Sequence, residues 1–259
     1  MKFPARLHVL LARDKPYGVI IRRGPAKSVC TIGWNRTKDV FTLGQWIRGR
    51  IYEHRCDLSP DGQYFLYFAL NGRWNSETKG SYTAISRAPY LKAITLYPQG
   101  DTWGGGGVFT GPRSYWIPGA ISPPLRESSE LKRDQSVLRW VGLPSMRLER
   151  NGWTPVAGEA AIYEKPAQHG WRLRKYLCSG LPADPGRGCH WEEHAIVHAA
   201  TERIHRIPEW EWADVDGSRI VWASKGTLNA TTLSRLGPGP DSQLADFNEM
   251  KFAAIQAPY

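Results

Sequence analysis

Residues 57–69 read DLSPDGQYFLYFA, a turn signal that runs directly into a short apolar strand. Asp61-Gly62 is a strong signal for a two-residue hairpin turn, because that turn needs positive φ, which Gly adopts freely and Asp better than most residues. The residues after the turn, Tyr64–Ala69, are aromatic or aliphatic and favour a β-strand. The stretch therefore predicts a β-hairpin, and a recurrence of the same unit would make the chain a repeat protein.

The same pattern, a Gly-led turn followed by a short apolar strand, occurs five times along the chain. The glycines are 44, 49, 47 and 59 residues apart. The five matches are GVIIRRGP from Gly18, GQYFLYFALNG from Gly62, GPRSYWIPG from Gly111, GEAAIYEKP from Gly158 and GSRIVWASKG from Gly217. Each is followed by a second strand-like run, namely residues 28–34, 82–88, 137–143, 171–177 and 227–233. The second and fifth copies agree best, since aligning their Asp-Gly pairs superposes turn and strand.

Several short strands in each unit of about 50 residues are typical of a β-propeller blade. We therefore predict an all-β chain that forms a single β-propeller domain over residues 1–259, with five blades. The polar stretches 71–80 and 121–135 interrupt the repeat and are expected to be loop insertions. The run MKFAAIQ, residues 250–256, is expected to be a terminal strand that closes the ring by pairing with or beside the first unit. No run of a dozen residues keeps a helical period with caps at both ends.

The composition supports strands and tight turns over long helices, with 12 Trp, 26 Gly and 19 Pro in 259 residues. The cysteines Cys30, Cys56, Cys178 and Cys189 are scattered and show no CxxC pair. The first residues, MKFPARLHVLLARD, hold an apolar run too short for a signal peptide or a membrane span. We expect a cytoplasmic protein with reduced thiols and no membrane association.

The net charge of +10 is concentrated in the first half of the chain. Residues 1–130 hold 18 Lys and Arg against 9 Asp and Glu, and the rest hold 16 against 15. The clusters in this half predict a basic face for phosphate or for an acidic partner, whereas the alternative is a solvated surface that keeps the protein soluble. The residues of that face are Arg22, Arg23, Arg48 and Arg50.

Ser59-Pro60-Asp61-Gly62 followed by Gln63–Tyr67 resembles the WD40-like repeat of TolB-type propellers, in which S-P-D-G precedes an inner strand. The resemblance covers about a dozen residues, with a looser echo at Asp216-Gly217, and the whole chain is similar to a group of bacterial proteins without an established activity. It implies a propeller that binds other macromolecules, and it carries over no catalytic residue. The chain departs from TolB proteins in lacking a signal peptide and their amino-terminal domain, which argues against a periplasmic role.

The string CHWEEHAIVH contains His190-x-x-Glu193-His194, the residue order of inverted zinc peptidases. On a helix the two histidines would lie one turn apart and could share a zinc ion. On a strand, residues four apart lie about 13 Å apart, too far for one ion. The segment occupies a strand position in the repeat, so we predict no metal site, with His190 and His194 as the ligand candidates if it were helical.

The stretch GDTWGGGGVFTG, residues 100–111, suggests a phosphate cradle, but the Lys-Ser/Thr of a P-loop is replaced by Pro112-Arg113. Closely packed or loop glycines are therefore expected here. Trp103 beside the glycines, Arg113 after them and Trp74 in the 71–80 insertion are predicted binding residues.

No nucleophile motif is present, and sequence alone cannot bring two carboxylates to the separation a glycosidase needs. The carboxylates considered for that role are Asp57, Asp61, Asp101, Glu159 and Asp216, of which Asp61 and Asp216 are better explained by their turns. The sequence thus predicts no catalytic residue and no cofactor. It predicts a scaffold for protein–protein interaction that is a subunit of a bacterial multi-protein system. The alternatives are a nucleic-acid-binding module and a hydrolase with an axial pocket. The partner and the oligomeric state stay open.

Overall fold

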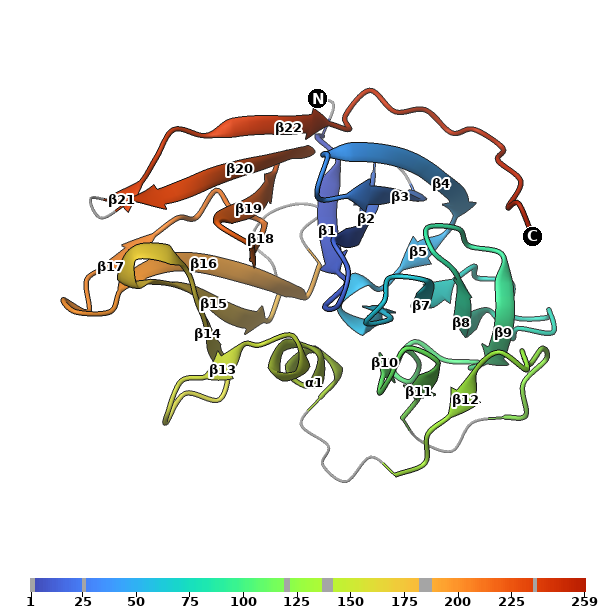
Figure 1. Cartoon of the computed structure of the whole chain (residues 1–259). Coiled ribbons are helices and arrows are strands. Elements are labelled where there is room, and N and C mark those ends of the chain that lie inside the picture. The colour runs from blue at the N-terminus through green and yellow to red at the C-terminus, as the bar shows by residue number, and fades with distance from the viewer. Residues whose placement is uncertain (1–2, 25–26, 119–121, 137–141, 182–187, 235–236) are drawn as a thin grey trace. The chain divides into compact units, whose positions relative to one another are not determined.

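The computed structural model describes residues 3–24, 27–118, 122–136, 142–181, 188–234 and 237–259. Within these ranges the strands form five sheets, and α1 (Leu143–Arg150) is the one α-helix (Figure 1). The prediction of an all-β chain is thereby confirmed. No helix in the described part is both long and apolar enough to span a bilayer.

The chain divides into two compact units, which are described separately. The first comprises Met1–Phe3, Val9–Arg147 and Lys251–Tyr259, and the second comprises Pro4–His8 and Leu148–Met250. The prediction of a single domain stays a prediction.

The first sheet is built from four strands that are neighbours in the order of the chain. They are β1 (Arg6–Leu11), β2 (Tyr17–Arg23), β3 (Ser28–Asn35) and β4 (Val40–Arg48). The pairs β2–β3 and β3–β4 are antiparallel. Consecutive residues of β2 and β3 are buried, so both faces of these strands are covered.

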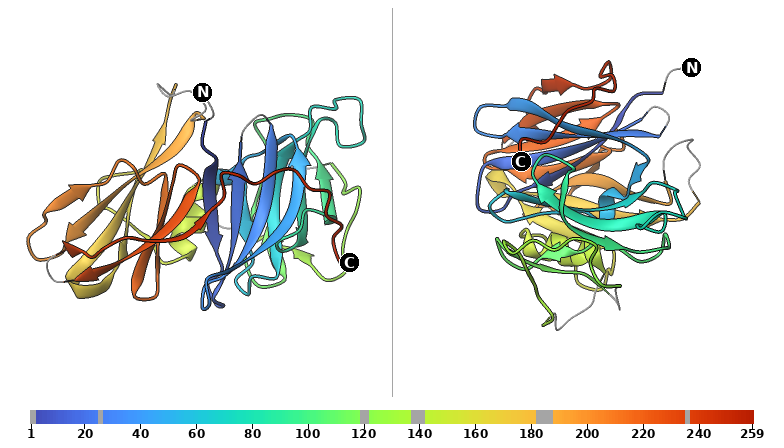
Figure 2. Two further views of the ribbon diagram at one scale, coloured as in Figure 1. Left: turned by 90° about the horizontal axis from the view of Figure 1, so that it is seen from above. Right: turned by 90° about the vertical axis from the view of Figure 1, so that its right-hand side faces the viewer.

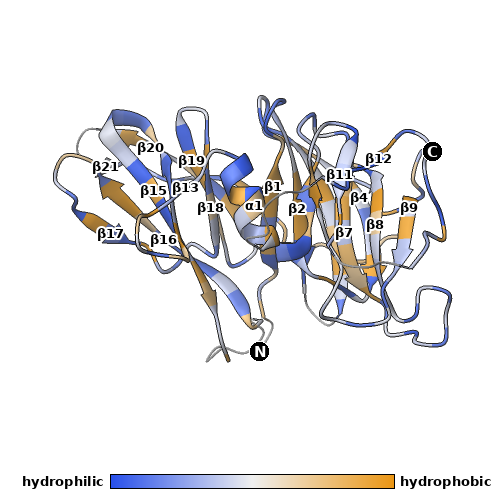
Figure 3. Ribbon diagram, turned by 90° about the horizontal axis from the view of Figure 1, so that it is seen from below, coloured by the Kyte–Doolittle hydropathy of each residue, from blue (hydrophilic) through white to orange (hydrophobic). Residues whose placement is uncertain are grey.

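The second sheet contains the stretch that opens the repeat. Its elements are β5 (Arg50–Ile51), the 3₁₀ turn η1 (Glu53–Arg55), β6 (Asp57–Leu58), β7 (Tyr64–Leu70), β8 (Ser81–Arg87) and β9 (Ala93–Pro98). β7 is the central strand, with β8 on one side and the short β5 and β6 on the other. All its residues from Tyr64 to Ala69 are buried, and Figure 3 shows hydrophobic colouring along β7 and β8. The apolar run of the opening stretch is therefore an inner strand.

The third sheet is small, with β10 (Val108–Phe109), β11 (Ser114–Trp116) and β12 (Lys132–Arg133). β10 and β11 form an antiparallel hairpin, whereas β12 runs parallel to β11. β12 lies inside the predicted 121–135 insertion, so that stretch is not a loop throughout. The polar side chains of β12 hid it from a search for apolar strands.

The second unit holds two further sheets, each again from a continuous stretch of chain. The first is an antiparallel meander of β13 (Thr154–Pro155), β14 (Ile162–Pro166), β15 (Trp171–Ser179), β16 (His190–His198) and β17 (Ile204–Arg206), with the 3₁₀ turn η2 (Gln168–Gly170) before β15. The second contains β18 (Trp212–Asp216), β19 (Arg219–Ser224), β20 (Thr227–Ser234), β21 (Gly237–Pro238) and β22 (Ser242–Asp246). Both β21 and β22 pair with β20.

Each of the five predicted units contains one of these sheets. Gly18 lies within β2, and the other four anchoring glycines lie in the turns before β7, β11, β14 and β19. The predicted second runs at 28–34, 82–88, 171–177 and 227–233 are β3, β8, β15 and β20. The remaining run, residues 137–143 of the third unit, lies mostly outside the described residues, and its last residue, Leu143, begins α1. With eight residues, α1 is too short to have shown a sustained helical period.

The two Asp-Gly turns differ from the prediction and from one another. At the first, the Gly62 amide donates to Ser59 O (2.8 Å), so Pro60 and Asp61 are the central residues and Gly62 follows with φ +74°. At the second, Asp216 pairs with Arg219, and the two-residue loop is Gly217-Ser218. Only the second is a two-residue hairpin, because Pro60 fixes a negative φ that shifts the first turn by one residue.

The prediction of a closing strand at residues 250–256 is wrong. The segment pairs with no strand among the described residues and is mostly exposed. It does run beside the first sheet (Figure 2), held by side chains: Gln45 Nε2 donates to Ile255 O (2.7 Å), and the Phe252 ring lies 5.9 Å from that of Trp46. The run has no buried apolar face that would reward pairing, which is why a ladder does not form.

Candidate functional site

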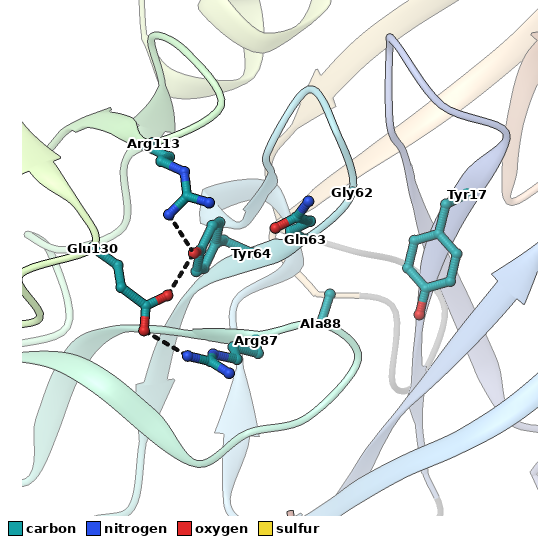
Figure 4. A pocket seen from close by; sticks show the side chains of 8 residues that line it. All are labelled: Tyr17, Gly62, Gln63, Tyr64, Arg87, Ala88, Arg113 and Glu130. Atoms are coloured by element: carbon teal, nitrogen blue, oxygen red, sulfur yellow. Dashed lines mark hydrogen bonds and ion pairs between the residues drawn. The ribbon is translucent and has the colours of Figure 1, made fainter. Parts of the chain in front are cut away.

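A cavity of about 570 Å³ opens in the first unit at the end of the second sheet where β7 begins (Figure 4). Five separate segments line it: the start of β2, the corner before β7, the end of β8, the β10–β11 turn and the loop before β12. The lining residues are Tyr17, Gly62, Gln63, Tyr64, Arg87, Ala88, Arg113 and Glu130. The opening stretch of the sequence thus supplies three consecutive lining residues.

The Ser-Pro-Asp-Gly corner is rigid because its side chains bond its own backbone. Ser59 Oγ donates to Asp61 Oδ1 (2.6 Å) and accepts from the Tyr64 amide (2.9 Å). Asp61 Oδ1 also accepts from the Gln63 amide (3.1 Å). These bonds fix the residues that line the pocket, and they explain why Asp61 is a turn residue.

One wall of the pocket is aromatic. The Tyr17 ring packs against Gly62, where an added Cβ would lie 3.0 Å from Tyr17 Cδ1, and the Tyr17 hydroxyl lies over Gly33, where a Cβ would overlap it. Burial, and next to it the neighbouring Tyr90, raises the pKa of Tyr17 to about 12. This wall therefore presents a neutral ring at any physiological pH.

The opposite wall is a polar chain of four residues from different elements. Tyr64 Oη donates to Glu130 Oε2 (2.7 Å), and Arg87 Nη2 donates to Glu130 Oε1 (2.5 Å). Arg113 Nη1 donates to Tyr64 Oη (3.4 Å). The hydrogen bonds from Tyr64 and then Arg87 lower the pKa of Glu130, whereas burial and the bond to Glu130 raise the pKa of Tyr64. Near neutral pH Glu130 is a carboxylate and Tyr64 a phenol, so neither is poised to exchange a proton.

Arg87 is held in place from behind by the carboxy-terminal residue. The Arg87 amide donates to Tyr259 Oη (3.0 Å), which itself donates to Lys92 O (2.8 Å). The Arg87 guanidinium also lies 5.2 Å from the centre of the Tyr259 ring. The tail therefore helps to position a residue of the pocket.

Of the predicted binding residues, Arg113 is the one that lines the pocket. It lies in the β10–β11 turn, and its carbonyl accepts from the Lys132 amide (2.8 Å), which fixes the backbone there. Its side chain is exposed. No sequence signal distinguished it beyond its place after the glycine-rich stretch.

The four arginines of the predicted basic face make contacts within the first unit. Arg22 is 1% exposed, donates to Gly24 O and lies 5.5 Å from the Trp46 ring, so burial removes it from any partner surface. Burial also lowers its pKa. The other three pair with a carboxylate or a ring: Arg23 with Glu53 (3.2 Å), Arg48 with Phe252 (5.2 Å) and Arg50 with Tyr52 (4.5 Å). None of the four lines the pocket.

Trp74 and Trp103 are exposed, by 53% and 87%, at the other end of the second sheet. Trp74 lies in the 71–80 loop between β7 and β8 and packs over Gly80. Trp103 follows β9, and Asp101 Oδ1 accepts from its amide (2.8 Å). Because β7 starts at the pocket and ends at this loop, the 71–80 insertion and Glu130 of the 121–135 insertion lie at opposite ends of the sheet.

The glycine-rich stretch is packed and does not form an anion nest. The Gly106 amide donates to Thr83 Oγ1 (2.8 Å) and the Gly107 amide to Arg55 O (3.4 Å). A Cβ on Gly105 would overlap the Phe68 ring. Of the two expectations for this stretch, packed glycines or a loop, the structure shows close packing at Gly105, Gly106 and Gly107.

The H-x-x-E-H segment is strand β16, as predicted, so His190 and His194 lie about 13 Å apart along it. His194 is buried, with Nδ1 2.9 Å from Trp210 O and Nε2 3.5 Å from Glu192 Oε2. Burial lowers the pKa of His194. Its ring is part of a buried cluster in which Lys175 Nζ lies 2.5 Å from Glu192 Oε2.

Four of the five carboxylates considered for catalysis, namely Asp57, Asp61, Asp101 and Asp216, have structural partners. Asp57 is buried and accepts from the Phe109 amide (2.6 Å), which ties β6 to β10. Asp101 holds the turn at Trp103, and Asp216 pairs with Arg219 (2.9 Å). The pocket residues that sequence reasoning missed are Tyr17, Gln63, Tyr64, Arg87 and Glu130, for which the only signal was their place at strand ends or in a polar insertion.

No protein-family model and no curated protein sequence matches this chain. Among solved structures, the chain is similar to Kuenenia stuttgartiensis hydrazine synthase, with a TM-score of 0.31 and 10% identity over 90% of this chain and 78% of that one. An acylaminoacyl peptidase in complex with Z-Gly-Gly-Phe-chloromethyl ketone gives a TM-score of 0.24 and 9% identity over 94% of this chain and 33% of the peptidase. A eukaryotic initiation factor gives 0.28 and 9% over 94% and 52%. Similarity at this level identifies neither a shared fold nor an activity.

Proposed function

We propose that this chain is a non-enzymatic five-bladed β-propeller that binds a protein partner at the pocket beside the Ser-Pro-Asp-Gly corner. The propeller is supported by the five sheets of the described residues, each formed from one continuous stretch of chain. Three of the sheets are antiparallel meanders of four or five strands, whereas the sheet of β10–β12 has three short strands. Such sequential sheets are what blades require.

The observation that carries the proposal is the pocket itself. Loop ends and turns from five segments converge there on a scaffold of buried strands, an arrangement typical of binding sites on rigid frames. Its side chains offer one aromatic wall and one wall rich in hydrogen-bond donors. A side chain of a partner can contact both walls.

Binding is favoured over catalysis by the chemistry of the lining. The eight lining residues include no Ser, Cys or His. Glu130 is engaged by Tyr64 and Arg87, and its lowered pKa makes it a weak base. A hydrolase with an axial pocket is therefore less well supported, and so is a nucleic-acid module, because the arginines predicted for it have partners within the chain.

The test fills the pocket without unfolding the protein. Gln63→Trp places a large ring at an exposed position of the lip, and Arg73→Trp places the same ring on an exposed loop at the other end of the sheet. We expect wild type and Arg73→Trp to capture the same protein from an extract of the native host, and Gln63→Trp to lose it. Capture that survives Gln63→Trp, or that Arg73→Trp abolishes, would contradict the proposed site.

A further inference from the structure

The charges of the pocket do not cancel. Its ionisable lining residues near neutral pH are Arg87, Arg113 and Glu130, which leave an excess of one positive charge. Glu130 is committed to Arg87, since Nη2 and Oε1 are 2.5 Å apart. The excess charge therefore belongs to Arg113.

Arg113 has more hydrogen-bond donors than its contacts within the chain use. Its guanidinium carries five N–H groups, and its hydrogen bond to Tyr64 Oη, at 3.4 Å, is long and occupies one of them. Its other contact is with the Tyr64 ring, 6.0 Å away. No ion pair of Arg113 is found in the described part of the chain, although its charge helps to lower the pKa of Glu130, which is paired with Arg87. The side chain is exposed, so its remaining donors are accessible from the pocket.

We propose that the pocket binds a carboxylate presented by a peptide segment of the partner, with Arg113 as the group that receives it. A planar carboxylate matches the two parallel N–H groups of a guanidinium and gains a bidentate charge-assisted bond. This inference rests on the proposed function, because it names the chemistry of the partner at the same site.

The charge count selects a carboxylate over a phosphate or a cation. One carboxylate neutralises the single excess charge, whereas a phosphate dianion would leave a negative charge close to Glu130. A cationic group would face both arginines. The other wall suits the rest of a peptide, since the neutral Tyr17 ring and the small Gly62 and Ala88 can take an apolar stem.

Gln63 and Arg87 orient the ligand without receiving its charge. Gln63 is exposed at the lip and offers an amide that can both donate and accept to peptide backbone. Arg87 is clamped between Glu130 and Tyr259, so it shapes the wall. The carboxylate can come from an Asp or Glu side chain or from a chain end, and the test separates these sources.

The probe is a synthetic array of 12-residue Gly-Ser peptides, each with one of the twenty residues or phosphoserine at its centre, made with free and with amidated carboxyl ends. Wild type is compared with Arg113→Gln, with Arg113→Lys, and with Arg73→Gln, which removes the same charge at the opposite end of the sheet. Circular dichroism checks that each variant folds.

We expect wild type to bind peptides that carry Asp or Glu, a free carboxyl end, or both, above amidated peptides with a neutral or phosphoserine centre. The preference between centred and terminal acids names the source. Arg113→Gln should weaken this binding about tenfold or more, because charge-assisted bonds are lost. Arg113→Lys should fall in between, and Arg73→Gln should match wild type.

Equal binding by wild type and Arg113→Gln, a preference for phosphoserine or for Lys, or no binding to any acidic peptide would each overturn the carboxylate inference. If Gln63→Trp nevertheless abolishes capture of the cellular partner, the proposed function survives and only the ligand chemistry is wrong. If Gln63→Trp has no effect while acidic peptides still bind through Arg113, the pocket binds carboxylates but the partner docks elsewhere.

Discussion

At the scale of the residue, each residue of the Ser-Pro-Asp-Gly corner has its own physical role. Ser59 bonds the Asp61 side chain and the Tyr64 amide, and Gly62 supplies a positive φ directly under the Tyr17 ring. That a turn lies here could be predicted from local propensity, although its central residues are Pro60 and Asp61 and not Asp61 and Gly62. Its contact with Tyr17, 45 residues away in the chain, could not, because no local pattern links the two positions.

Gly62→Ala should destabilise the protein for two reasons. The residue has φ +74°, which costs about 1 kcal/mol or more for an L side chain, and the added methyl would press on Tyr17. Gly72→Ala is the matched control, since it has φ +70° with nothing within 4 Å of an added Cβ. We expect urea denaturation to show a loss of about 1 kcal/mol for Gly72→Ala and a larger one for Gly62→Ala. Equal losses would mean that the Tyr17 contact adds no strain.

At the scale of the element, the strands of the second unit carry polar groups where a simple pattern expects apolar ones. On β15 and β16, Lys175 and Glu192 are buried together, and His194 lies beside them under Trp210 O. The H-x-x-E-H string resembles a metal motif only in letters. The strand geometry, which was predicted, separates His190 from His194, and the burial of His194, which was not, reflects packing between neighbouring strands.

Removing one member of the buried Lys175–Glu192 pair should lower the free energy of unfolding markedly. Lys175→Met removes the partner at 2.5 Å from Glu192, and losing one member of a buried ion pair typically costs about 3–5 kcal/mol. Lys175→Met/Glu192→Gln should recover part of that loss, because the buried charge is also removed. Arg206→Met is the control, since Arg206 and Glu193 form an exposed pair worth less than about 1 kcal/mol. Chemical denaturation measures all three, and a small effect of Lys175→Met would show that Glu192 is satisfied without it.

His194 should make stability fall as the pH drops. Burial lowers its folded-state pKa below the unfolded value of about 6.5, so the unfolded chain binds a proton that the folded chain does not. The contribution of His194 to the free energy of unfolding is therefore fully present well above pH 6.5 and is lost as the pH falls below about 6.5. Between pH 7 and 5, His194→Gln should show a shallower decline than wild type, whereas the exposed His190→Gln should show the wild-type slope. Parallel slopes for all three proteins would exclude this contribution.

The tail is an element without secondary structure that still stabilises the first unit. Removing residues 251–259 deletes the hydrogen bond of Gln45 to Ile255 and two of Tyr259, each worth about 1 kcal/mol. We expect the truncated protein to fold with a free energy of unfolding lower by about 2–3 kcal/mol. The double substitution Lys251→Ala/Gln256→Ala, within the same tail, should be near neutral. A truncation without effect would mean that the ordering entropy of the tail offsets its contacts.

At the scale of the whole molecule, a net charge of +10 affects solubility and the rate of association with anionic partners, and it does not by itself identify a binding site. The arginines that sequence clustering singled out are engaged within the first unit, and Arg22 is buried. The one that reaches a pocket, Arg113, stood outside those clusters. Proximity along the chain was therefore a poor guide to a shared surface.

Binding to nucleic acid should accordingly be weak and purely electrostatic. In fluorescence anisotropy with a labelled 30-nucleotide single strand, we expect no measurable binding at 150 mM salt and only weak binding at 50 mM, falling steeply as salt is added. Poly-glutamate of similar length, tested with wild type and with Arg113→Gln, is the control, because attraction that survives Arg113→Gln is general attraction to polyanions. Tight binding that persists at physiological salt would favour the nucleic-acid alternative over the protein partner.

The sequence by itself indicated the number and order of the sheets, since a glycine followed by an apolar run recurs once in each, although Gly18 lies within β2 and not in a turn. It also placed β16 as a strand, because the segment holds a strand position in the repeat, and it left close packing or a loop open for the glycine-rich stretch. Tertiary structure alone decided that the terminal run forms no ladder, that Arg22 is buried and that Arg113, Tyr64, Glu130 and Arg87 meet. Their separations of up to 66 residues are closed by strand pairing and core burial, which no local signal encodes.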